Sequence, residues 1–155
     1  MNEKRLGIQQ ALPKLKQYCT YQERCHIEVK EKLNAYGLYG QEASNIIATL
    51  VEENYLNEQR FAIQFAGGHF RLKQWGRVKI KHALKQKQIN DYCIRKALEQ
   101  IEDQNYLNLL RELCEKKARS LKSEKNSYVR KRKLQTFLLQ RGFESDLIKE
   151  ELTKL

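Results

Sequence analysis

The sequence predicts an all-α protein, an elongated and curved array of three tandem three-helix repeats with about nine helices. Three observations lead to this prediction. The 155-residue chain contains seven Gly and one Pro, so it has few of the turn-forming residues that separate the strands of strand-rich folds. Lys, Glu, Gln and Leu, which favour helices, are abundant. The tetrapeptide Asn-Tyr-Leu-Asn occurs at residues 54–57 and returns 51 residues later, at 105–108.

The second copy of this tetrapeptide brings its apolar neighbours with it at the same offset. A third copy follows, with three extra residues inserted in the polar stretch near 120–127. Equivalent apolar positions in the three copies are Val29, Ile80 and Leu134, and then Leu33, Leu84 and Leu138. A period near 50 is typical of arrays whose units bury apolar faces against their neighbours. We therefore treat 1–155 as one protein with repeats at about 4–54, 55–105 and 106–155.

The first repeat is expected to open with a helix near residues 4–18, which Pro13 can kink or split. Thr20 and Glu23 are spaced as a capping box, so they are expected to begin the second helix. Gly37 suits the left-handed position that ends such a helix. A third helix, with apolar residues at helical spacing, completes the repeat.

The long first helices of the second and third repeats are expected at about 58–73 and 109–121. Asn57 and Asn108, the last residues of the two tetrapeptide copies, are placed to cap them. The tetrapeptide is therefore interpreted as a joint between repeats rather than as a binding motif.

The remaining turns follow the pattern of the first repeat. Gly142 matches Gly37, whereas the second copy has Gln88 at this place. Asn90 and Ser145 are expected to cap the last helices of the second and third repeats.

The net charge of +11 is concentrated in one part of the chain. Residues 1–66 contain eight Lys and Arg and eight Asp and Glu, whereas residues 67–155 contain 22 and 11. This asymmetry indicates a polyanionic partner, either nucleic acid or an acidic protein surface. A solvated basic face without a partner is the alternative.

Two groups of cations are the candidate binding residues, on a scaffold whose repeats present an extended concave surface. In the first group, Lys73, Arg77, Lys81 and Lys85 recur every four residues, and Arg71, Lys79 and Lys87 lie close by along the chain. The second group comprises Lys116, Lys117, Arg119, Lys122, Arg130, Lys131, Arg132 and Lys133. Trp75 either stacks on a partner or packs at a helix junction. The pattern fits single-stranded DNA, double-stranded DNA and an acidic protein polymer alike.

Catalytic and metal-binding patterns are missing. No phosphate-binding loop or nucleophile elbow is present, and Gly67-Gly68-His69 falls inside a helical pattern. The four cysteines lack the paired spacing of a zinc site, so neither metal nor cofactor is expected. No apolar run suits a signal peptide or a membrane span. We expect a cytoplasmic, monomeric protein with reduced thiols that is not an enzyme.

Three short motifs resemble the RecX family of bacterial regulatory proteins, over about residues 10–155. They are Tyr55-Leu56 followed by Arg60-Phe61-Ala62, Trp75-Gly76 leading into Lys79-Ile80 and Leu84, and Arg141-Gly142-Phe143. The chain departs from the family at Asn57-Glu58, where two acids are common, and at Gln88, where Gly is common.

The resemblance implies three three-helix repeats without catalytic activity. Proteins of this family bind the recombinase RecA, chiefly as filaments on single-stranded DNA, and typically inhibit its recombinase and co-protease activities. The implied setting is recombination, DNA repair and the SOS response. The alternative is a nucleic-acid-binding helical module that acts independently of RecA. The sequence leaves open whether the chain inhibits or tunes RecA, and whether protein or DNA contacts dominate.

Overall fold

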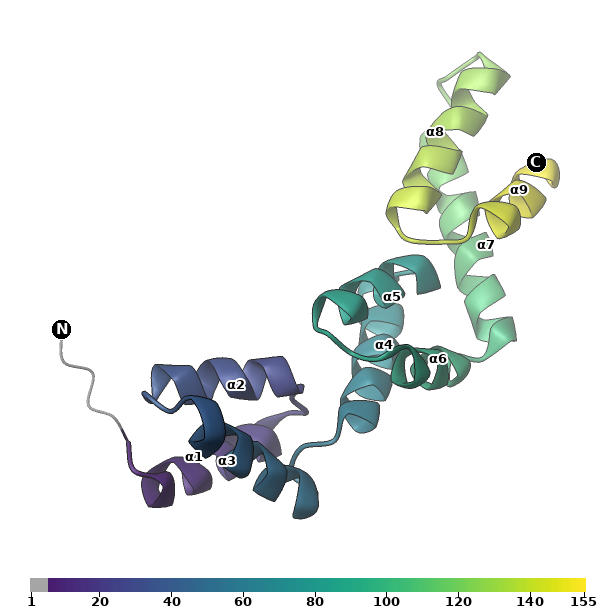
Figure 1. Ribbon diagram of the computed structural model, residues 1–155. Coiled ribbons are helices and arrows are strands. Elements are labelled where there is room, and N and C mark those ends of the chain that lie inside the picture. The colour runs from purple at the N-terminus through teal and green to yellow at the C-terminus, as the bar shows by residue number, and fades with distance from the viewer. Residues whose placement is uncertain (1–5) are drawn as a thin grey trace.

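The computed structural model describes residues 6–155, and over that range it contains nine α-helices and no β-strand (Figure 1). The helices are α1 (Ile8–Tyr21), α2 (His26–Ala35), α3 (Gly40–Glu52), α4 (Glu58–Lys73), α5 (Arg77–Gln86), α6 (Asp91–Glu99), α7 (Asp103–Ser120), α8 (Ser127–Gln140) and α9 (Ser145–Thr153). The predicted all-α fold is confirmed, and α4 has the bounds that the sequence predicts.

The helices form three consecutive groups, α1–α3, α4–α6 and α7–α9, which we call units 1, 2 and 3. The repeat is visible in the helix bounds, because α2 and α5 begin 51 residues apart, as do α3 and α6. Helix α9 begins 54 residues after α6. The units follow one another in a bent row, which confirms the predicted elongated array (Figure 1). The repeat bounds of 4–54, 55–105 and 106–155 stay a prediction.

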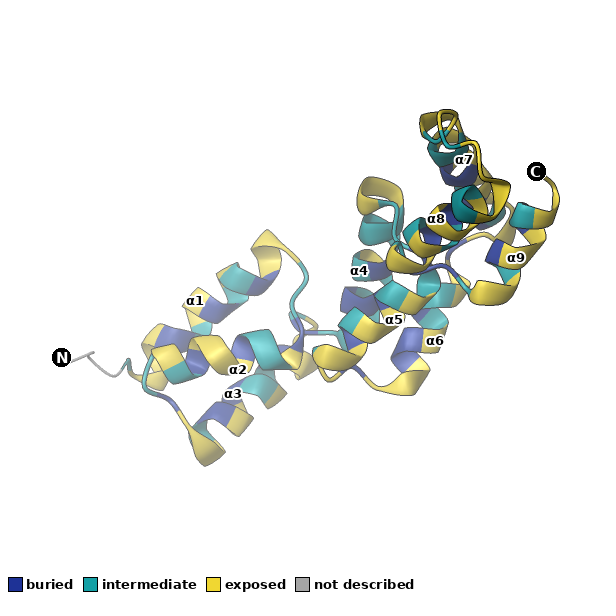
Figure 2. Cartoon of the chain, turned by 90° about the horizontal axis from the view of Figure 1, so that it is seen from above, coloured by how far each residue is buried: buried dark blue, intermediate teal, exposed yellow. Residues whose placement is uncertain are grey.

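Residues 6–155 form two hydrophobic cores. Unit 1 has its own core, in which Leu33 and Leu50 are fully buried. Units 2 and 3 share the larger one, which includes Leu84 of α5 and Leu138 of α8. Cys25, just before α2, is the buried residue that unit 1 contributes to this larger core. Buried residues line the inward faces of the helices in Figure 2. Units 2 and 3 are therefore one packed body, to which unit 1 is joined.

Helix α5 shows how the apolar period positions charged side chains. Ile80 and Leu84 are fully buried four residues apart, whereas Lys81 and Lys85 are exposed. Burying one such aliphatic side chain stabilises the fold by about 1.5–3 kcal/mol. This burial holds a ten-residue helix that is too short to be stable alone.

The left-handed turns predicted at Gly37 and Gly142 are present, and unit 2 has one as well. Gly37 has φ 79° and Gly142 has φ 95°, as expected for glycine at this position. Gln88 adopts φ 61° at the equivalent place in unit 2. This conformation costs a residue with a Cβ atom about 1–2 kcal/mol. The fold therefore imposes the turn even where the sequence lacks glycine.

The predicted capping box at Thr20 and Glu23 is wrong. Helix α1 runs on to Tyr21, so the Thr20 hydroxyl donates to a main-chain oxygen of its own helix at 2.7 Å. The cap residue of α2 is Cys25, whose amide donates to the Glu28 carboxylate at 3.0 Å. The first helix was expected near residues 4–18, of which 4 and 5 lie outside the described residues, and Pro13 does not split it.

The predicted cap at Asn90 is confirmed, because its side-chain oxygen accepts from the Cys93 amide at 2.8 Å. The predicted cap at Ser145 is wrong. Helix α9 begins at Ser145 itself and Glu144 is the cap residue. The Glu144 carboxylate is drawn away from the helix end, because Arg77 of unit 2 binds it.

The two copies of Asn-Tyr-Leu-Asn have different structures. Asn57 caps α4 as predicted, and its side chain accepts from the amide three residues on at 2.9 Å. Helix α7 already begins at Asp103, so the prediction that Asn108 caps it is wrong. The helix starts early because Tyr106 and Leu110 then share one helical face, and both are fully buried in the larger core.

Candidate functional site

Two motifs singled out in the sequence, Trp75-Gly76 and Arg141-Gly142-Phe143, meet between units 2 and 3. The Gly76 amide donates to the carbonyl of Arg141 at 2.7 Å, and the amide two residues on donates to Gly142 at 2.9 Å. A Cβ atom on Gly76 would lie 2.3 Å from the Gly142 carbonyl oxygen. Only glycine permits this approach of two backbones. These motifs therefore form the unit 2–unit 3 joint.

Arg77 is half-buried at the same joint and is held by two carboxylates. Its guanidinium lies 3.0 Å from Glu144 and 2.8 Å from Asp103, and 3.8 Å from the ring centroid of Tyr106. The Tyr106 hydroxyl donates to Glu144 and accepts from the Arg77 amide. Burial, with the bond to Glu144, raises the pKa of Tyr106, so its phenol remains a donor. Arg77, a predicted partner contact, is thus engaged inside the protein.

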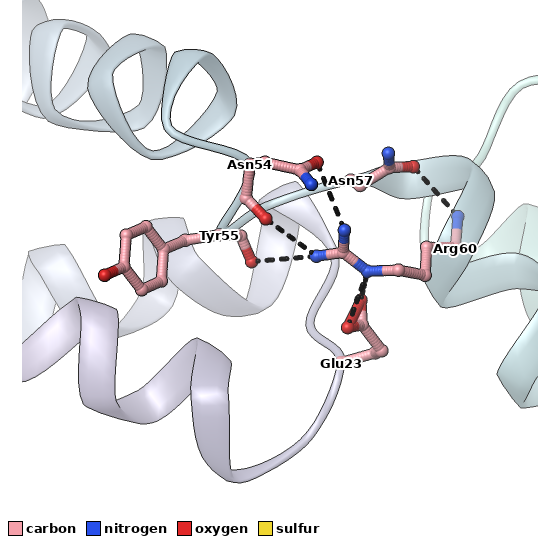
Figure 3. Close-up of polar contacts among 5 residues, drawn as sticks. All are labelled: Glu23, Asn54, Tyr55, Asn57 and Arg60. Atoms are coloured by element: carbon pink, nitrogen blue, oxygen red, sulfur yellow. Dashed lines mark hydrogen bonds and ion pairs between the residues drawn. The ribbon is translucent and has the colours of Figure 1, made fainter.

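Arg60 ties unit 2 to unit 1 (Figure 3). Its Nε lies 2.7 Å and 2.6 Å from the two carboxylate oxygens of Glu23. Its other nitrogens donate to the side-chain oxygen of Asn54 at 3.1 Å and to the Asn54 carbonyl at 3.0 Å. Nearby, Lys87 Nζ lies 3.6 Å from the Glu28 carboxylate. The first Asn-Tyr-Leu-Asn copy therefore belongs to the unit 1–unit 2 joint.

The predicted basic stripe of unit 2 does not form one open face. Besides Arg77 and Lys87, which face the two joints, Lys79 Nζ lies 4.7 Å from the ring centroid of Trp75. Lys85 Nζ lies 3.8 Å from the Asp91 carboxylate. The remaining predicted cations of this unit are exposed, and they are Arg71, Lys73 and Lys81. The cations of this stripe that contact groups within the protein itself therefore include Arg77, Lys79, Lys85 and Lys87.

The second predicted group of cations lies at the end of α7, in the following turn and at the start of α8. Its exposed members are Lys116, Arg119, Lys122, Lys131, Arg132 and Lys133, and its half-buried members are Lys117 and Arg130. The acid of this segment, Glu124, lies 3.5 Å from Lys133. Within residues 6–155, no carboxylate lies within ion-pair distance of Lys116, Lys117 or Arg132. Unit 3 therefore presents cations that the protein itself does not neutralise.

A groove of about 460 Å³ runs between α7 and α8, and we call it the α7–α8 groove. Lys117 and Leu121 of α7 line it, together with Tyr128, Arg132 and Phe137 of α8. Lys117 Nζ lies 5.0 Å from the Phe137 ring centroid. Tyr128 is 71% exposed. The groove thus combines cations with accessible aromatic surface.

A smaller hollow of about 190 Å³ adjoins the groove and shares Lys117 and Phe137 with it. It extends to Gln74 of the α4–α5 turn and to Lys116 and Arg141. Among the described residues that line the two hollows, none is Asp or Glu. The surface therefore reaches from the unit 2–unit 3 joint along unit 3 and carries positive charge throughout.

Sequence reasoning identified the cations of this surface but missed Tyr128, Phe137 and Arg141 as lining residues. A signal for the aromatic residues was present. Tyr128 precedes Arg132 by four residues, and Lys133 precedes Phe137 by four, so each cation shares a helix face with a ring. The sequence placed Arg141 only in a family-like motif. Arg141 and α7 are distant along the chain, so the sequence alone could not show that they lie close together in space.

Other chemistry is sparse. Cys19, Cys25, Cys93 and Cys114 are free thiols in buried positions. Burial raises the pKa of all four, and that of Cys25 to about 11, which disfavours the reactive thiolate. Within the described range, no three His, Cys, Asp or Glu side chains gather as a metal site. Between residues 6 and 155, no helix is long and apolar enough to cross a membrane.

Comparison with known proteins finds two family models along the chain. "RecX, second three-helix domain" matches residues 57–98, and "RecX, third three-helix domain" matches 103–152. "Regulatory protein RecX" of Chlorobaculum tepidum is 33% identical over 123 residues, which are 79% of this chain and 74% of that protein. The protein of the same name from Clostridium botulinum strain Eklund 17B is 33% identical over 124 residues, 79% of this chain.

The Clostridium protein and the one from Bacillus cytotoxicus are longer, and this chain spans 58% and 54% of their lengths. Among solved structures, RecX from Lactobacillus salivarius superposes with a TM-score of 0.86 at 26% identity, covering 96% of both chains. Another structure of a regulatory protein RecX, 22% identical, gives a TM-score of 0.84 over 96% of this chain and 72% of that chain. This second likeness concerns the fold alone.

Proposed function

This chain belongs to the RecX family of regulatory proteins, and from that premise we propose that it binds RecA and inhibits its recombinase and co-protease activities. The target is chiefly the RecA filament on single-stranded DNA. The chain acts by binding alone, without a chemical reaction of its own. The name that its relatives carry, regulatory protein RecX, supports a regulatory role.

One observation supports this function most, namely that Lys116, Lys117 and Arg132, which have no carboxylate within ion-pair distance among the described residues, line the α7–α8 groove and its adjoining hollow. A surface with positive charge and no acid attracts a polyanionic assembly and accelerates its encounter. The bent row of three units gives this surface an extended setting (Figure 1). An extended scaffold suits a long, repetitive target better than a small ligand.

The experiment follows ATP hydrolysis by RecA on single-stranded DNA while the chain is added in substoichiometric amounts. We expect the rate to fall, and the chain to sediment with the filaments. An unchanged rate, together with a chain that stays in the supernatant, refutes the proposal.

The contribution of unit 3 is tested with a Lys116→Glu and Arg132→Glu double variant. Both side chains are exposed, so the fold should be retained. The concentration for half-inhibition should rise about tenfold, because two unneutralised cations become acids. The matched control is Lys14→Glu with Lys149→Glu, which changes the net charge equally at exposed sites outside both hollows. Equal effects of the two double variants would reject unit 3 as the contact.

A second candidate function is a nucleic-acid-binding module that acts without RecA, and the aromatic rings in the groove favour it. In a competition experiment, this function predicts that naked DNA removes the chain from RecA filaments efficiently. It also predicts no change in RecA hydrolysis. Retention on filaments in the presence of excess naked DNA favours RecA regulation.

A further inference from the structure

We infer that the α7–α8 groove binds a short stretch of single-stranded nucleic acid. Lys117 and Arg132 contact its phosphates, and its bases stack on Tyr128 and Phe137. The inference deepens the proposed function and rests on it for its setting, because a regulator of this filament meets single-stranded DNA at its target. The inference adds the chemical class of the ligand that the α7–α8 groove binds at that target.

Charge is the first argument. Lys117 and Arg132 line the groove, and no described residue that lines it is an acid. The amino-terminal end of α8 also lies here, capped by Asn126, whose side chain accepts from the Tyr128 amide at 3.0 Å. A helix amino terminus adds partial positive charge. The groove therefore favours an anionic chain along its length.

The aromatic rings are the second argument, and they separate a single strand from an acidic peptide. Within residues 6–155, no hydrogen bond, ion pair or ring contact engages the Tyr128 phenol, and the side chain is 71% exposed. Phe137 is half-buried, with Lys117 5.0 Å and Arg141 5.4 Å from its ring centroid. Stacking of unpaired bases on such rings is the common mode of single-strand binding. An acidic peptide would use the cations and leave the Tyr128 ring without a partner.

The order of residues along α8 is the third argument. Tyr128 and Arg132 are one turn apart, and Lys133 and Phe137 are likewise, so each ring lies one helical turn from a cation. A nucleotide strand likewise places a charged phosphate next to each flat base. A duplex does not, because its bases are stacked inside and paired. The groove of about 460 Å³ lies within the size range of sites that bind a small ligand.

The test measures fluorescence anisotropy of a labelled oligothymidine of about 16 nucleotides titrated with the full chain. Tyr128→Ala should weaken binding about tenfold, through the loss of one stacked base. Arg132→Gln should reduce the slope of log affinity against log salt by about 0.7, the value for one phosphate contact on a single strand. The matched control Lys149→Gln removes an exposed cation of unit 3 outside the groove and should change neither quantity.

Misfolding is separated from lost contacts by the choice of side chains. Tyr128 and Arg132 are exposed, so the helical circular dichroism and the urea midpoint of both variants should match the parent chain. Phe137→Leu is a further variant, which keeps an apolar side chain against the core and removes the ring. It should weaken oligothymidine binding while the chain stays folded.

The outcomes distinguish this inference from the proposed function. Absence of saturable binding to oligothymidine at low salt overturns the inference, and so do equal affinities of Tyr128→Ala and Lys149→Gln. If these groove variants lose inhibition of RecA while naked strands are not bound, the groove contacts protein, and the inference fails while the proposed function stands. If strands bind through the groove and RecA hydrolysis does not change, the proposed function fails and the inference stands.

Discussion

Gly76 and Gly142 lie so close that a Cβ atom on Gly76 would be 2.3 Å from the carbonyl oxygen of Gly142. The contact joins two backbones from different units, so neither side can rotate away as a flexible side chain would. Gly76 itself has φ −78°, which any residue adopts, and its requirement for glycine is therefore steric rather than conformational.

The first prediction follows from this contact. Gly76→Ala should lower the free energy of unfolding by about 1–3 kcal/mol, because the added methyl group forces the two turns apart. Urea denaturation followed by circular dichroism measures the change. Gly68→Ala is the matched control, since a Cβ atom there meets nothing within 4 Å and the residue lies inside α4. It should raise stability by about 0.5–1 kcal/mol. Equal effects would contradict the steric account.

The second prediction concerns the joint between units 1 and 2. Arg60→Ala should destabilise the protein by about 1.5–3 kcal/mol, because it removes charge-assisted hydrogen bonds and leaves the Glu23 carboxylate, 16% exposed, without its cation. A double-mutant cycle with Glu23→Ala should give a coupling energy above about 0.5 kcal/mol. Lys96→Ala, which breaks an exposed ion pair with Glu99, should change stability by less than about 1 kcal/mol. A coupling energy near zero would mean that Arg60 and Glu23 act independently.

The third prediction concerns the left-handed turn of unit 2. Gln88→Gly should raise the free energy of unfolding by up to about 1 kcal/mol, since glycine adopts φ 61° without the Cβ conflict but costs more backbone entropy. Gly37→Ala, at φ 79° in unit 1, should lower it by about 1 kcal/mol. Thermal and urea unfolding of both variants provide the measurement. A destabilised Gln88→Gly variant would show that the Gln side chain contributes more than the turn geometry costs.

The fourth prediction is a pH dependence. The pKa of Cys25 rises from about 9 to about 11 in the folded protein because the thiol is buried. Between these pH values the unfolded chain loses a proton that the native protein keeps, so the contribution of the protonated thiol, fully present below pH 9, is lost as pH rises toward 11. Its size is about 2–3 kcal/mol.

This dependence is isolated by comparing the parent chain with Cys25→Ser, which does not titrate in that range and keeps a side chain suited to the helix cap. Urea unfolding at several pH values from 8 to 11 should show a shallower decline for the variant. Parallel curves would show that Cys25 titrates normally in the folded protein.

The sequence predicted the helices well where apolar residues repeat at helical spacing, as in α5, where Ile80 and Leu84 mark the buried face. It failed at helix starts that depend on distant contacts. Ser145 has the local chemistry of a cap, yet α9 begins there because Glu144 precedes it and reaches Arg77. No local pattern encodes a partner 67 residues away along the chain.

The candidate site was predictable in composition and not in geometry. Charge counts located the cations of units 2 and 3, but spacing alone could not show that Arg77 meets two carboxylates while Arg132 meets none. Likewise, the repeated tetrapeptide correctly indicated a duplicated architecture, although its second copy lies within α7 and Tyr106 takes a buried role there.

The division of the buried residues into two cores affects how the amino-acid sequence can change during evolution. A substitution at Leu84 or Phe143 is transmitted across both C-terminal units, because these residues share one interior. A substitution at Leu33 or Leu50 is confined to α1–α3. The N-terminal unit is therefore free to drift in sequence at its own pace, so long as Cys25 and the Glu23–Arg60 pair preserve its attachment.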